Sequence, residues 1–172
     1  MKKLSIIALF AFISLTITAQ NKSILLGGSF GYNDDETTKT LNFNPYLGYN
    51  FNNNWTIGAN LGLNSVKTGT ADAEQMTQFG PFVRYTKNIT DIFGVFGDFG
   101  ANYITGSGSK SGFNFAITPS VYANIGRAFA LTASIGGFGY QSYGVDVAKK
   151  TNFNLGFGND FKLGIMRNFG IK

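Results

Sequence analysis

The chain has 172 residues, a formal charge of +5, no cysteine and no histidine. Without cysteine it can form no disulfide and carry no thiolate nucleophile or lipidated N-terminal cysteine, and without histidine it lacks the commonest general base and transition-metal ligand. Charged residues make up 13% of the chain, whereas aromatic residues reach 16% and there are 23 glycines. This balance indicates a surface that largely does not meet water, and the lack of a basic run argues against nucleic acid as a partner.

The first nineteen residues have the pattern of a signal peptide. Lys2 and Lys3 form a positively charged n-region, residues 4–17 form an apolar h-region, and Ala19 provides a small residue for cleavage. The h-region is shorter than the roughly 20 residues of a membrane-spanning helix, which argues against an uncleaved anchor. We therefore expect residues 1–19 to be removed, which lowers the charge from +5 to about +3.

The mature segment, residues 20–172, is expected to be one domain because a single pattern runs along it. Large apolar residues alternate with Gly, Asn, Ser and Thr, as in residues 55–64, where odd positions are apolar and even ones are small or amide. Successive side chains of a strand point to opposite faces, so each segment has one apolar and one polar face. Eight strands long enough to cross a bilayer when tilted are predicted at 23–33, 38–50, 55–66, 76–87, 92–105, 113–125, 128–140 and 152–168.

The predicted connections alternate in length. Short hairpin turns are predicted at 52–54, 88–91 and 126–127. Mostly longer, polar connections are predicted at 33–37, 67–74, 106–112 and 141–151. Short turns at one rim and longer loops at the other are typical of outer-membrane barrels.

All three prolines occupy the same place in a repeat. Pro45, Pro81 and Pro119 each follow a small or polar residue in mid-strand, and Phe161 stands at that place in a fourth copy. The spacing makes one hairpin the repeating unit, so four hairpins give eight strands. Because proline forfeits a ladder hydrogen bond, we predict a bulge at each one.

The alternation alone also fits a soluble lipocalin-like barrel with its apolar face inward. However, a soluble exterior as poor in charge as this polar face would be hard to keep monomeric. The apolar face also carries more bulk than a narrow eight-stranded interior holds, whereas it could cover a belt facing lipid. Aromatic residues near the strand ends suit interfacial girdles: Tyr32, Tyr49, Phe51, Trp55, Tyr85, Phe93, Tyr103, Phe113, Phe129 and Phe153. We predict an all-β, eight-stranded antiparallel transmembrane up-and-down β-barrel behind a cleaved signal peptide.

In these features the chain resembles the small eight-stranded outer-membrane barrels of the OmpA/OmpX type. It looks more closely like the proline-containing hairpin barrels of Bacteroidetes, whose signal peptides often end in Ala-Gln, as Ala19-Gln20 does here. The chain ending is similar to the signal read by barrel-assembly machinery, carried here by Lys162, Gly164 and Phe169, although Arg167 occupies a normally apolar place. The resemblance implies the outer membrane of a Gram-negative bacterium, with both termini periplasmic. It also implies contact with outer-membrane lipid and lipopolysaccharide, and with periplasmic chaperones and the assembly machinery during biogenesis.

Four charged residues on the polar face are the candidate site: Arg84, Asp98, Asp160 and Lys162. Because unpaired buried charges are costly, we predict a salt-bridge network that plugs the lumen, with Arg84 and Asp98 diagonal to each other on neighbouring strands. No catalytic, cofactor-binding or metal-binding residue is predicted. The acidic segment 34–36 lacks the spaced oxygen ligands and turn glycine of a calcium loop.

The expected function is that of a monomeric, non-enzymatic integral outer-membrane protein with a structural or surface-interaction role. Two alternatives remain open at this point. One is a porin-like narrow passive pore or small-solute carrier through the lumen, and the other is a lipid-modifying outer-membrane enzyme.

Overall fold

The computed structural model describes residues 22–35, 37–70, 72–107, 110–126, 129–145 and 148–170. The predicted signal peptide, residues 1–19, lies outside these ranges. Within them, no helix is long and apolar enough to cross a membrane. The described residues form eight strands: β1 (Ser23–Asp34), β2 (Thr38–Asn50), β3 (Trp55–Thr68), β4 (Glu74–Asn88), β5 (Phe93–Gly106), β6 (Lys110–Asn124), β7 (Phe129–Val145) and β8 (Ala148–Gly170).

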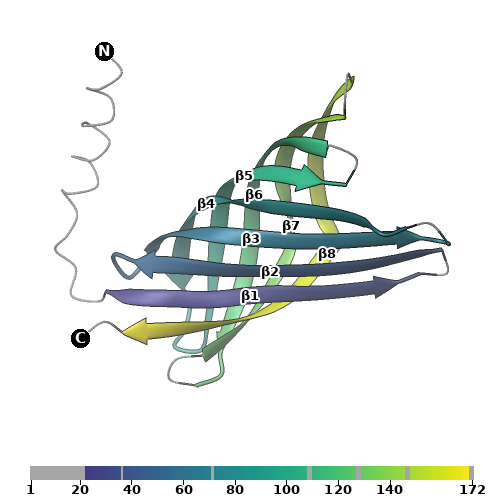
Figure 1. Ribbon diagram of the computed structural model, residues 1–172. Coiled ribbons are helices and arrows are strands. Elements are labelled where there is room, and N and C mark those ends of the chain that lie inside the picture. The colour runs from purple at the N-terminus through teal and green to yellow at the C-terminus, as the bar shows by residue number, and fades with distance from the viewer. Residues whose placement is uncertain are drawn as a thin grey trace, which may run out of the picture.

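The strands close into a barrel. Each strand pairs antiparallel with its neighbours in the chain, and β1 also pairs with β8 (Figure 1). At this seam Ser23 pairs with Gly170, and the ladder continues to Phe30 and Leu163. The predicted fold class of an eight-stranded antiparallel up-and-down barrel is therefore confirmed. We call the end that holds Ser23 and Gly170 the terminal end, and the opposite end the loop end.

The strands at the loop end are longer than predicted, and their connections are correspondingly short. Only residues 35–37, 69–73, 107–109 and 146–147 lie between strands there. The prediction of longer loops at this rim was wrong, because strand pairing continues through polar sequence. In the first hairpin, for example, Asp34 pairs with Lys39, and the two side chains form an ion pair of 3.0 Å.

Two of the turns at the terminal end are held by side-chain oxygens. Asn52 Oδ1 accepts hydrogen bonds from the backbone N–H groups of Asn54 and Trp55, at 2.8 and 2.7 Å. In the next turn Thr90 Oγ1 accepts from Phe93 N at 2.9 Å. Asn and Thr satisfy turn donors in this way when no strand partner is available, which explains why short turns could be predicted at these positions.

The prolines interrupt the ladder on one side only. Pro45, Pro81 and Pro119 pair with Gly28, Ala59 and Gly97 of the preceding strands. Toward the following strand, pairing lapses beside each proline. Of the three prolines, only Pro119 lies beside a register shift, between Ile117 and Ser120, and the bulges predicted at Pro45 and Pro81 were wrong. A second register shift lies between β7 and β8, at Ile135 and Gly136. Because proline has no N–H, one hydrogen bond of the ladder is missing. Pairing can pass over that position in both strands, so neither strand needs the extra residue that defines a bulge.

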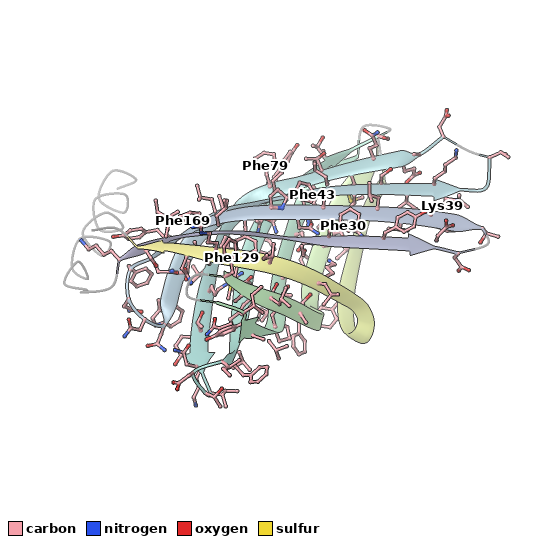
Figure 2. All side chains as sticks on the ribbon, turned by 90° about the horizontal axis from the view of Figure 1, so that it is seen from below. Phe30, Lys39, Phe43, Phe79, Phe129 and Phe169 are labelled. Atoms are coloured by element: carbon pink, nitrogen blue, oxygen red, sulfur yellow. The ribbon has the colours of Figure 1, made fainter. Side chains whose placement is uncertain are left out.

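The two faces of the wall lie as predicted. Large apolar side chains are exposed on the outer surface, among them Phe30, Phe43 and Phe79 (Figure 2). The lumen holds amides, hydroxyls and glycines, with a small cluster of buried apolar residues toward the terminal end. That cluster consists of Leu25, Phe96, Tyr122, Ala130 and Met166.

Candidate functional site: a charged plug in the lumen

Arg84 of β4 and Asp98 of β5 form a two-pronged ion pair inside the barrel. Arg84 Nε donates to Asp98 Oδ1 at 2.6 Å, and a terminal guanidinium nitrogen donates to Oδ2 at 2.8 Å. The two residues are direct cross-strand partners, not diagonal ones as predicted. Direct opposition lets the planar guanidinium meet both carboxylate oxygens in parallel, which is the strongest geometry for such a pair.

The guanidinium is enclosed by aromatic rings from three strands. Its central carbon lies 3.9 Å from the ring centroid of Phe96, 4.6 Å from that of Tyr46 and 5.6 Å from that of Phe82. The third guanidinium nitrogen, Nη1, donates to Tyr46 Oη at 3.3 Å. Arg84 is consequently only 2% exposed. Aromatic faces stabilise a cation through their quadrupole, so these rings replace part of the water that Arg84 has lost.

This layer of side chains, which we call the plug, consists of Tyr46, Phe82, Arg84, Phe96 and Asp98. It lies between two cavities. The larger, about 610 Å³, lies on the loop side, and the smaller, about 450 Å³, lies on the terminal side. Arg84 borders both of them. The lumen is therefore a pair of chambers separated by a charged, aromatic layer.

The other two charges of the predicted network do not join this pair. Lys162 lines the loop-side chamber and forms no ion pair with any side chain that the structure describes. The side chain of Asp160 lies outside the described part of the chain. The structure thus brings together Arg84 and Asp98, two of the four predicted residues.

The aromatic half of the plug was missed because the interior was expected to hold little beyond small and amide residues and a few paired charges. The signal was nevertheless present in the alternation. Tyr46 has the same parity as its inward-facing neighbours Asn44 and Gly48, and Phe82 lies between Gly80 and Arg84 on the inward face of β4. Side chains two apart share a face, so position alone placed these rings inside.

A polar network at the terminal end was also missed. Asn50 Nδ2 donates to Ser23 Oγ at 2.7 Å and to Asn168 Oδ1 at 2.8 Å, and Asn50 Oδ1 accepts from the Thr56 hydroxyl. These bonds connect β2 with β1, β3 and β8. They reinforce the seam at which the chain closes on itself.

Of the ten predicted girdle aromatics, Tyr49 and Phe51 are half-buried and the others are exposed. Trp55 and Tyr85 are cross-strand partners whose rings lie 4.9 Å apart. At the terminal rim, the guanidinium of Arg167 lies 4.7 Å from the Phe129 ring and 4.5 Å from the Phe169 ring (Figure 2 labels both rings). These contacts explain how a cation is accommodated at a normally apolar position of the final strand.

The fold and the plug define a class: a small, closed, eight-stranded barrel whose lumen is filled at one level by side chains. The chain is similar to the crystal structure of the outer membrane protein OprG from Pseudomonas aeruginosa, with a TM-score of 0.53 and 13% identity over 88% of this chain and 97% of that one. It also aligns with the outer membrane protein Ail of Yersinia pestis in a phospholipid bilayer nanodisc, with a TM-score of 0.46 and 17% identity over 87% of this chain and 99% of that one. No family model and no curated protein matches the chain. At 13% identity the OprG likeness bears on the fold alone.

Proposed function

We propose that this chain is a monomeric, non-enzymatic integral protein of the outer membrane of a Gram-negative bacterium. It acts through its wall and its loop end, in a structural or surface-interaction role. The observation that carries the proposal is the plug, set within a barrel whose outer surface is apolar.

The outer surface supports a membrane location. Side chains such as Phe30 and Leu163 are 58% and 59% exposed, and exposed apolar residues occur on every strand of the barrel. Water-soluble monomers rarely expose continuous apolar patches of more than a few hundred Å². In lipid the same surface is favourable, and the closed sheet satisfies the backbone hydrogen bonds that an open edge would leave unmade.

The plug supports a role other than conduction. An ion that crosses the barrel would have to displace Arg84 from a carboxylate and from the faces of three rings. Separating a buried ion pair leaves uncompensated charges in a medium of low polarity, which is strongly unfavourable. A barrel closed in this way can anchor, stiffen or present a surface, but it offers no continuous path.

The orientation follows from how such barrels are assembled. We place both termini in the periplasm and the loop end outside, in contact with lipopolysaccharide. Lys162, Gly164 and Phe169 on β8 then form the assembly signal, and the exposed Phe169 is available to the assembly machinery at the terminal rim.

Single-channel recording in planar lipid bilayers tests the proposal. We expect the purified barrel to insert without steady openings, and a variant that removes the plug, Arg84→Ala with Phe96→Ala, to conduct. Lys39→Ala, which changes an exposed charge at the loop end, is the matched control and should remain silent.

The two chambers favour one alternative, a narrow pore or solute carrier, because together they occupy much of the lumen. That alternative predicts steady openings of the unmodified protein, whose conductance changes when Asp98 is neutralised. Such openings would overturn the closed-barrel proposal.

A further inference from the structure

The loop-side chamber has the dimensions of a ligand site. Its volume of about 610 Å³ falls within the usual range of roughly 300–1,000 Å³ for pockets that hold small molecules. It extends from the plug residues Phe82 and Arg84 to Gln141 and Phe153 on the long ends of β7 and β8. The plug closes the chamber toward the terminal end, so a molecule that enters from the loop end stops at the plug residues.

The wall of this chamber is dominated by neutral hydrogen-bonding groups. Six amide side chains line it, together with hydroxyls of Ser and Thr: Asn44, Asn60, Gln78, Asn102, Asn114 and Gln141. The amides come from six different strands, β2 to β7, so they face the chamber from several sides. Each amide supplies both donors and acceptors, which suits a ligand that presents many of both.

Two of these amides carry acceptors that the protein leaves unused. Asn102 and Asn114 are direct cross-strand partners on β5 and β6, and the Oδ1 atom of each is buried without a hydrogen bond from the described residues. Asn102 is only 7% exposed. Buried acceptors are normally satisfied, so this adjacent pair points to a bound molecule that brings hydrogen-bond donors.

The described side chains of the chamber carry few charges. Arg84 already neutralises Asp98, and Lys162 is the one further charge among the described lining side chains. Asp98 remains 25% exposed at its side chain, and each carboxylate oxygen keeps a lone pair for another donor. The aromatic plug residues Tyr46, Phe82 and Phe96 also line the chamber and supply apolar contact surface.

We propose that the loop-side chamber binds a small neutral polyhydroxylated molecule, namely a mono- or disaccharide. Its hydroxyl groups donate to Asn102 Oδ1, Asn114 Oδ1 and the Asp98 carboxylate, and its C–H face packs on the plug. This site needs only the chamber and the plug, so it is independent of whether the barrel conducts.

Saturation-transfer NMR on the folded barrel in lipid nanodiscs tests this site, with D-glucose and maltose as probes and gluconate as a charged analogue. We expect transfer to glucose or maltose, and shifts of the Asn102 and Asn114 side-chain amide resonances when the sugar is added. Asn102→Leu, which removes one unused acceptor, should weaken binding at least tenfold. Ala116→Phe, which fills the chamber from β6, should abolish it.

Asn42→Leu is the matched control, because Asn42 faces the lumen on β2 without lining the chamber. It should bind sugar as the unmodified protein does. Absence of transfer to both sugars would overturn the proposal, as would unchanged binding in both Asn102→Leu and Ala116→Phe. Stronger binding of gluconate than of glucose would overturn the neutral ligand class. If Asn102→Leu fails to fold, the amide shifts and Ala116→Phe still decide the question.

Discussion

Arg84 meets a carboxylate, a phenol and aromatic ring faces within one layer of the lumen. Each contact offsets a different part of the free energy that the guanidinium loses when it leaves water. Asp98 supplies the counter-charge, Tyr46 accepts a further hydrogen bond, and the rings supply weak attraction on the open faces. Because the charge is almost fully buried, the loss of any partner cannot be made up by water.

Asp98→Asn should therefore destabilise the barrel markedly. It leaves the Arg84 charge buried without a counter-ion, a change that costs about 3–5 kcal/mol in comparable buried pairs. Unfolding by urea in detergent micelles, followed through the fluorescence of the single tryptophan, Trp55, measures the loss. Asp34→Asn is the control, since its ion pair with Lys39 is exposed and such pairs contribute little.

Replacing both Arg84 and Asp98 distinguishes the cost of an unpaired buried charge from the cost of lost packing. Arg84→Met with Asp98→Leu should recover most of the stability that Asp98→Asn loses, because apolar replacement of a whole buried pair is often neutral. If the double variant is as unstable as Asp98→Asn, the plug acts through packing and not through its charges.

Among the elements, β4 and β5 carry four of the five plug residues and, among the described glycines, the closest approach of backbone atoms. A Cβ atom added to Gly80 would lie 2.0 Å from the backbone oxygen of Ala101, whereas one added to Gly100 would lie 3.4 Å from the Asn102 side chain. Pairing between the two strands lapses at Gly80 and Pro81 and resumes at Phe82. Glycine at position 80 thus permits a close approach that no other residue allows.

Gly80→Ala should destabilise the barrel by about 1–3 kcal/mol, since backbone atoms must move to accept the methyl group. Gly100→Ala should be tolerated, with a change of less than about 1 kcal/mol, because its methyl group makes ordinary contacts and alanine is less flexible when unfolded. The urea midpoints of the two variants measure the difference. Equal midpoints would contradict the close approach.

Much of this arrangement could be predicted from the sequence, because the two-residue period fixes which side chains share a face. It placed Arg84 and Asp98 together in the lumen and Phe79 outside it. The register could not be predicted, since it depends on how far each hairpin slides; this is why the pair was expected to be diagonal. Strand ends at the loop rim were also missed, because polar residues such as Asp34 and Lys39 pair across strands without an apolar signal.

At the scale of the whole molecule, the same alternation of side chains gives the barrel an apolar exterior and a polar, partly filled interior. The closed sheet leaves the outer surface with no hydrogen-bonding edge, and the seam between β1 and β8 is reinforced by the Asn50 network. In the proposed membrane location, the wall shields the interior polar groups from lipid, and these groups form the plug and line the chamber. The orientation of the wall is the claim on which the proposed function rests.

Spin labels on adjacent residues of β4 test that orientation directly. Phe79 is exposed on the outer surface and Gln78 lines the loop-side chamber, and the chain has no cysteine of its own to label. In liposomes, a label at Phe79→Cys should relax faster with oxygen, which concentrates in lipid, and a label at Gln78→Cys faster with a water-soluble nickel chelate. The reverse pattern, with the chelate reaching position 79 and oxygen reaching position 78, would contradict the account.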